Sequence, residues 1–193
     1  MANIAFNVAL LSYLISALGY TFYLVYRESV VNLISAVSLG MGLFSHTTTI
    51  VLRSVETGHG PYTTGFEIAS FLAWVIVVIY FLTEYKYKIK DLGAFVIPVV
   101  FLILFYSTFQ SREVLLIDES STMFWLTMHR TLSIIGYAAF AIAFGVALMY
   151  LIQEHQVKSK KLGVMYFRMP SLEVLDELNY KVIAIGFPLF TLG

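Results

Sequence analysis

Long apolar runs separated by polar connections alternate along the whole chain. Five of these runs are long enough, or nearly so, to cross the hydrocarbon core of a bilayer, which takes about 20 helical residues. They cover residues 4–26, 31–52, 66–83, 92–109 and 125–152. The pattern therefore predicts an all-α protein, a polytopic bundle of transmembrane helices that forms a single domain over residues 1–193.

A sixth apolar run begins at about Tyr180 and contains only fourteen residues up to Gly193. A run of this length is too short to span a bilayer. We expect it to be the start of a sixth span that is truncated at Gly193, and a short re-entrant segment is the alternative. Residues 153–179 precede it as the one long polar connection, in which MPSLEVLDELNY predicts a short interfacial helix capped by Ser171.

The composition agrees with lipid as the medium around the helices. The 193 residues are 59% hydrophobic and 12% charged, whereas soluble domains are about 25% charged. The net charge of zero gives no reason to expect a nucleic acid partner. The chain contains no cysteine, which excludes disulfides, thiolate metal sites and a Cys-x-x-Cys-His haem attachment motif, so it is not itself a c-type cytochrome.

Because successive spans cross the membrane in opposite directions, odd- and even-numbered connections lie on opposite sides of it. Lysine and arginine are distributed unevenly between these two sides. Nine of the twelve lie in the odd-numbered connections or at the start of the sixth run. The three exceptions are Arg53, Arg112 and Arg130. Because cytoplasmic connections are enriched in these residues, we expect the odd connections, including residues 153–179, to be cytoplasmic and the N-terminus to be outside. His59 and His129 then lie at the outer surface, where Arg53 is expected to pair locally with Glu56.

The stretch FWLTMHRTLSIIGYAAF, residues 124–140, places a histidine near the outer end of the fifth span. At helical spacing, Trp125, His129 and Tyr137 share one face. An aromatic face with one histidine suits a flat, apolar ligand that carries a metal, such as haem, and Arg130 would point toward headgroups or a haem propionate. The same spacing also suits an interfacial belt, with Trp125 and Arg130 at headgroup level and His129 only hydrogen-bonded. Spacing alone leaves both interpretations open.

Two further histidines are candidates for a site. His46 lies within the second run, where a histidine is costly unless it is bonded, so it is either an alternative haem ligand or a packed polar residue bonded across helices. His59 lies between two glycines in GHGPYTTGFEIASFLAW, a turn-rich entry to the third span. Thr63 or Thr64 is expected to cap that span, with Glu67 in its first turn. The sequence contains no nucleophile–base pair, phosphate loop or carboxylate pair, and we predict no catalytic residue.

Four stretches, in order and with matching spacing, resemble the CcsA/ResC-type cytochrome c biogenesis proteins. They are GHGPYTTGFEIASFLAW, MHRTLSIIGYAAFAIAF, MPSLEVLDELNYKVIAIGFPLFTLG and, more loosely, HTTTIVLR, and the resemblance covers most of the chain from about residue 46 onward. It implies a system II protein of the bacterial inner membrane that acts with a ResB-type partner as part of a holocytochrome c synthase. Such proteins move haem b across the membrane and present it at the outer face to an apocytochrome c with a Cys-x-x-Cys-His motif.

The resemblance also implies roles for individual residues. By position, His129 corresponds to the first external histidine of these proteins and would be an axial ligand of the haem iron. Its neighbours Trp125 and Arg130 would then pack against the haem and contact a propionate. Three residues of the outer loop and the third span are expected to support the outer site: His59, Glu67 and Trp74.

The resemblance is incomplete, and two other functions stay open. The tryptophan-rich segment and the second external histidine of the family should lie beyond Gly193, so this stretch of chain alone is expected to be inactive. One alternative is a b-type electron-transfer protein in which His46 and His129 ligate one haem. The other is a haem-free transporter or channel-like subunit.

Overall fold

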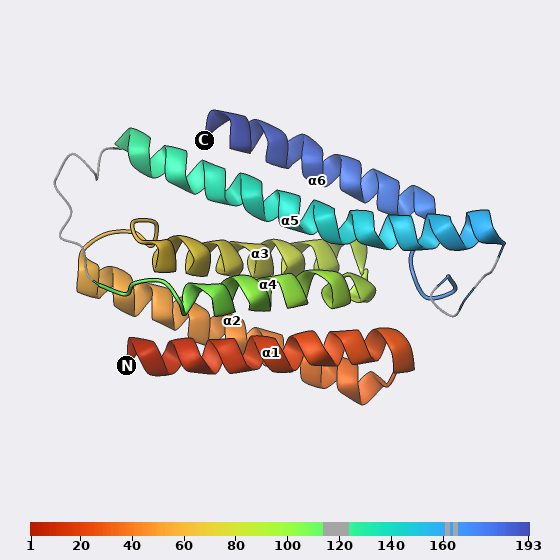
Figure 1. Cartoon of the computed structure of the whole chain (residues 1–193), viewed down its shortest axis with the longest axis horizontal. Coiled ribbons are helices and arrows are strands. Elements are labelled where there is room, and N and C mark those ends of the chain that lie inside the picture. Colours follow the sequence, from red (N-terminus) through yellow and green to blue (C-terminus); the bar gives the residue numbers. More distant parts are fainter. Residues whose placement is uncertain (114–123, 161–162, 164–165) are drawn as a thin grey trace.

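The structure, a computed structural model, describes residues 1–113, 124–160, 163 and 166–193 (Figure 1). Across these ranges the chain forms α-helices and one short 3-10 helix, with no strand. The elements are α1 (Ala2–Tyr26), α2 (Ser29–Thr57), α3 (Gly65–Tyr87), η1 (Lys90–Leu92), α4 (Gly93–Ser107), α5 (Phe124–Ser159) and α6 (Leu172–Leu192). The predicted all-α bundle is confirmed, and α1, α2, α3, the η1–α4 segment and α5 are long and apolar enough to cross a membrane.

Consecutive helices run in opposite directions, so the connections gather at the two ends of the bundle (Figure 1). One end holds the N-terminus, the 58–64 loop, the start of α5 and the C-terminal end of α6. The other end holds the α1–α2 and α3–α4 connections and the end of α5. We call these the outer end and the inner end, following the sidedness that the lysine and arginine distribution predicts.

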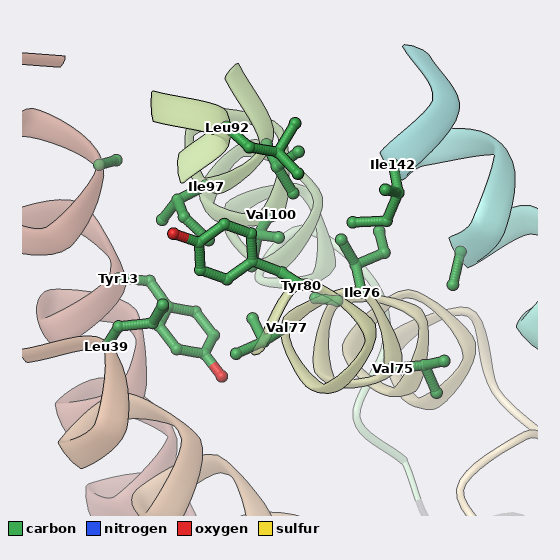
Figure 2. Close-up of a cluster of buried hydrophobic side chains, with 14 of the residues drawn as sticks. Tyr13, Leu39, Val75, Ile76, Val77, Tyr80, Leu92, Ile97, Val100 and Ile142 are labelled. Atoms are coloured by element: carbon green, nitrogen blue, oxygen red, sulfur yellow. The ribbon is translucent and has the colours of Figure 1, made fainter. Parts of the chain in front are cut away.

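The core lies around α3 and α4, which run between the α1–α2 pair and the α5–α6 hairpin (Figure 1). Figure 2 shows Tyr80 of α3 beside Ile97 of α4, and Ile76 of α3 pointing toward Ile142 of α5. Tyr13 of α1 lies on the opposite side of α3 from Ile142, and all five of these side chains are fully buried. α3 is therefore the central helix, in contact with elements on both of its sides.

Two predicted helix starts are confirmed. The hydroxyl of Thr64 accepts a hydrogen bond from the backbone N–H of Glu67, and the Glu67 carboxylate accepts one from the N–H of Thr64, which makes a capping box at the start of α3. Ser171 caps α6 by accepting from the N–H of Val174. These caps satisfy backbone donors that the first helical turn leaves unpaired.

The segment before the sixth run differs from the prediction in its helical boundaries. The expected interfacial helix is not a separate element, because it continues through Tyr180 into the sixth run as the single helix α6. The charged side chains in its first half (Glu173, Asp176, Glu177 and Lys181) are exposed and leave the backbone hydrogen bonds of the helix intact, so the change from polar to apolar composition does not end the helix. The connection is also shorter than predicted, since α5 extends to Ser159; residues 161–162 and 164–165 within it lie outside the described residues.

Close approach of α5 and α6 depends on two glycines. A Cβ atom added at Gly136 on α5 would lie 2.9 Å from the backbone nitrogen and Cα of Phe190 on α6. One added at Gly186 on α6 would lie 2.6 Å from the Cβ of Ala139. Small residues allow helix backbones to approach closely in a membrane, where van der Waals packing replaces the hydrophobic effect between helices. This packing holds α6 against α5 up to the outer end.

We expect Gly136→Ala to separate α5 from α6, because the added methyl group meets backbone atoms of Phe190 that cannot rotate away. Overpacking of this kind costs about 1–3 kcal/mol. The measurement is the thermal unfolding midpoint of the purified protein in one detergent. Gly40→Ala is the matched control: it lies inside α2 with nothing within 4 Å of the added atom, so it should leave the midpoint unchanged or raise it. Equal midpoints for the two variants would contradict the packing described here.

Candidate functional site

The 58–64 loop lies against the first turns of α5 at the outer end. The Tyr62 hydroxyl is 3.2 Å from the Thr127 hydroxyl. The Arg130 guanidinium lies over the ring of Tyr62, 5.8 Å from its centre, which is a cation–π contact. These contacts join residues about 65 positions apart in the sequence, and they place the loop beside His129.

A pocket of about 200 Å³ lies where α3, α5 and this loop meet. Its walls are mostly apolar or aromatic, with one imidazole and one guanidinium among them. The lining residues are Tyr62, Ile68, Leu72, His129, Arg130, Ser133, Ile134 and Tyr137. An apolar cavity with a few converging polar groups is the usual form of a small-molecule site.

His129 lies at this pocket with its side chain exposed. No hydrogen bond to its ring is formed by any residue that the structure describes. A neutral imidazole with an uncommitted ring nitrogen can donate a lone pair to a metal. The geometry therefore leaves His129 able to act as a ligand, in contrast to the belt interpretation, in which it is hydrogen-bonded.

Arg130 and Trp125 occupy different positions relative to the pocket. Nη1 of Arg130 is buried and has no hydrogen-bond partner within the described ranges. Since an unpaired buried guanidinium nitrogen is costly, it favours a ligand that brings an acceptor such as a carboxylate. Trp125 does not line the pocket: its side chain is 80% exposed, beside Phe124 at the outer start of α5.

Only part of the predicted aromatic face of α5 is open. Tyr137 packs against Phe190 of α6 with ring centres 4.9 Å apart, and Phe140 packs against the same ring at 5.6 Å. Phe190 of α6 therefore contacts this face from Tyr137 inward, while Tyr137 itself stays 52% exposed and lines the pocket. His129 lies farther toward the outer end and is also exposed, so the accessible part of this face extends from Trp125 to Tyr137 and does not include Phe140.

Glu67 is the centre of a polar cluster behind the loop. Its side chain is 2% exposed, and Arg53 of α2 donates to it across 2.8 Å. The second carboxylate oxygen accepts from the backbone N–H groups of Thr63 and Thr64 and lies 3.9 Å from Nδ1 of His59. The expected local pairing of Arg53 with Glu56 is wrong, because Glu67 reaches Arg53 from the neighbouring helix while Glu56 is exposed.

Arg112, after α4, completes this cluster on the side of α1. Its guanidinium lies over the rings of Phe6 and Phe66, at 4.7 and 4.8 Å from their centres. Its backbone oxygen accepts from Arg53 at 3.1 Å. Partial burial, and secondarily the charge of Arg53, lower the pKa of Arg112 from its ordinary value. The cluster thus ties α1, α2, α3 and the end of α4 together.

Neither His46 nor Trp74 lines the pocket: His46 lies in the interior, and Trp74 is half-buried. His46 is fully buried, with Nδ1 3.3 Å from the Tyr13 hydroxyl and Nε2 2.8 Å from the Ser70 hydroxyl. Trp74 donates from its indole nitrogen to the hydroxyl of Thr47 across 2.8 Å. Both ring nitrogens of His46 have hydrogen-bond partners, which agrees with one of the two interpretations of the sequence, a packed polar residue bonded across helices. This geometry does not support a role for His46 as a haem ligand.

The outer site offers single ligands rather than a metal cluster. In the described part of the chain, no group of three His, Cys, Asp or Glu side chains could hold a metal ion. A haem needs one or two axial donors, because the porphyrin supplies the other four. The exposed imidazole of His129 and the unpaired Arg130 nitrogen fit such a group.

Tyr62 lines the pocket, and sequence reasoning does not identify it as a site residue. The one feature that could have drawn attention to Tyr62 is that it is an aromatic residue in a loop rich in glycine and proline.

Comparison with known proteins connects this region to one family. Residues 62–193 match the family model described as cytochrome C assembly protein. The chain is 27% identical to the cytochrome c biogenesis protein CcsA of Guillardia theta, over 99% of the chain and 70% of that protein. It is 28% identical to CcsA of Chlorella vulgaris, over 80% of the chain and 59% of that protein. It is also 29% identical to protein HemX of Brevibacillus brevis, over 74% of the chain and 53% of that protein. No solved structure matches.

We expect Glu67→Gln to loosen the outer end, because it leaves the nearly buried Arg53 guanidinium without its counter-charge. Removing one partner of a buried ion pair costs about 3 kcal/mol. The thermal unfolding midpoint should fall, and the backbone amides of residues 58–67 should be the first to exchange faster with solvent.

Glu56→Gln is the matched control, since Glu56 is an exposed glutamate near the end of α2. It should change neither the unfolding midpoint nor the exchange. If Glu67→Gln behaves like this control, Glu67 does not organise the outer end.

Proposed function

The chain belongs to the cytochrome c assembly protein family, and from this premise we propose that its role in cytochrome c biogenesis is to hold haem at the outer end of the bundle. The haem is cargo for transfer to an apocytochrome c with a Cys-x-x-Cys-His motif. His129 is the axial ligand, and Arg130 contacts a propionate. The protein acts in the bacterial inner membrane with a ResB-type partner, as part of a holocytochrome c synthase.

The single observation that carries this proposal is the pocket at His129. It combines an accessible imidazole, an unpaired guanidinium nitrogen and apolar walls within one cavity. Haem has the complementary set of groups: an iron that takes nitrogen donors, propionates that accept hydrogen bonds and an apolar macrocycle. An interfacial belt would need none of these groups to face a shared cavity.

The size of the pocket indicates how much of the haem it contacts. Its volume of about 200 Å³ is below the roughly 300–1,000 Å³ of enclosed ligand sites. The pocket therefore holds one edge of the haem, and the rest lies across the exposed outer surface of α5 near Trp125. A loosely enclosed haem suits a protein that passes its cargo on, because a fully buried one would be released slowly.

The alternative function, b-type electron transfer, requires a different pair of residues to bind the haem. It needs His46 and His129 on one haem, whereas His46 is fully buried between α1, α2 and α3 with both ring nitrogens hydrogen-bonded. Freeing His46 would leave the Tyr13 and Ser70 hydroxyls without that partner. The outer-site proposal needs no such rearrangement.

We expect His129→Ala to lower the haem content of the purified protein by at least about tenfold, because the iron loses its protein ligand. It should also lower the amount of covalent haem on c-type cytochromes in a host that depends on this protein for their maturation. The haem is measured by absorption spectroscopy, and the cytochromes by haem staining of membrane proteins.

His155→Ala is the matched control, because His155 is another exposed histidine of α5, near its inner end. It should retain wild-type haem content and cytochrome maturation. His46→Ala should change stability without removing a second axial ligand from the spectrum. Unchanged haem content and maturation in His129→Ala would refute the proposal, and loss of one bis-histidine spectrum in both His46→Ala and His129→Ala would support the electron-transfer alternative instead.

A further inference from the structure

A second, larger groove opens on the outside of the bundle between α3 and α6. Both helices pack against α5, and α5 forms the floor of the groove between them. Its volume is about 300 Å³. The apolar walls come from all three helices, through Ile79 and Leu82, Ile135 and Ala139, and Ile185 and Leu189. Leu82 and Ile185 are 63% and 65% exposed, so the groove is open toward the surrounding lipid.

Two ammonium groups lie at the inner end of this groove. Lys86 of α3 and Lys181 of α6 both line it, and their Nζ atoms are 5.5 and 5.8 Å from the centre of the same ring, that of Tyr87. Glu177 pairs with Lys181 one turn away, and both side chains of this pair are exposed. Lys86 forms no ion pair with any described residue. The inner end of the groove is therefore cationic, while the rest is apolar.

We propose that this groove binds an anionic phospholipid of the inner leaflet. One acyl chain lies along the apolar groove, and the phosphate lies between Lys86 and Lys181. An empty apolar groove would forfeit dispersion contacts that an acyl chain supplies. The two lysines lie at the end of the bundle that the charge asymmetry assigns to the cytoplasm, where anionic headgroups attract basic residues.

The lining favours a phospholipid over haem, which shares its combination of an apolar body and anionic groups. None of the residues lining the groove is histidine, cysteine or methionine, and the ring of Tyr87, the one lining residue of a type that ligates haem iron, is occupied by contacts with both ammonium groups. A phospholipid needs only the apolar walls and the cations. The proposal therefore does not depend on haem binding at His129.

The test is native mass spectrometry of the purified protein with added phosphatidylglycerol or phosphatidylcholine of the same acyl chains. Wild-type protein should retain phosphatidylglycerol preferentially. A juxtamembrane lysine contributes about fivefold in affinity, so the double variant Lys86→Gln, Lys181→Gln should bind it roughly 25-fold more weakly. Lys158→Gln is the matched control: Lys158 also lies at the inner end and also pairs with a glutamate four residues away, but it does not line the groove. It should bind as wild type does.

A second variant separates binding in the groove from attraction of headgroups to surface lysines. Ile185→Trp narrows the groove and keeps both lysines, so it should also weaken phosphatidylglycerol binding. Unchanged binding in Ile185→Trp, or equal retention of the two lipids by the wild type, would overturn the proposal. Displacement of the lipid by haem in the wild type, with haem binding lost in the lysine variants, would assign the groove to haem and would also overturn it.

Discussion

The buried carboxylate of Glu67 is the constraint on which the outer end depends. A carboxylate that is 2% exposed needs a counter-charge and hydrogen bonds, and Glu67 obtains them from Arg53 on another helix and from the backbone of its own helix start. Since these partners come from α2 and the 58–64 loop while Glu67 itself lies on α3, satisfying one side chain fixes how three segments meet. The outer loop is therefore held by an ion pair and a capping box rather than by apolar packing alone.

The position of the loop determines what His129 faces. Tyr62 follows His59 in the loop and contacts Thr127 and Arg130 on α5, so the wall of the pocket is set by the same connection that Glu67 holds. On the other side, Phe190 of α6 contacts Tyr137, and both Tyr137 and His129 stay exposed. An accessible imidazole beside a loop that is fixed in place suits the proposed haem site. The Glu67 carboxylate thus acts on the pocket through the loop, and the α5–α6 contact at Gly136 lies next to one of its walls, Tyr137.

Features that depend on local sequence could be predicted, and those that depend on helix neighbours could not. The apolar runs predicted the bundle, and the caps at Thr64 and Ser171 followed from residue type and spacing. Arg53 was assigned the wrong partner because Glu56 is one turn away in sequence, whereas Glu67 becomes close only when α2 and α3 pack. The contact of Tyr62 with α5 and the contact of Tyr137 with Phe190 are likewise long-range. The position of His46 in an apolar run indicates that its side chain needs hydrogen-bond partners. Which hydroxyls supply them depends on how the helices pack, so the sequence could not identify them.

Axial ligation of haem iron by His129 is the central claim, and chemical replacement of that ligand tests it most directly. The measurement is haem binding by the His129→Gly protein as a function of imidazole concentration, followed in the Soret region of the absorption spectrum. Removal of the side chain leaves space for a free imidazole where the ring stood. The account predicts weak haem binding without imidazole and recovery of the wild-type spectrum as imidazole is added. Wild-type haem binding by the variant without imidazole would contradict it.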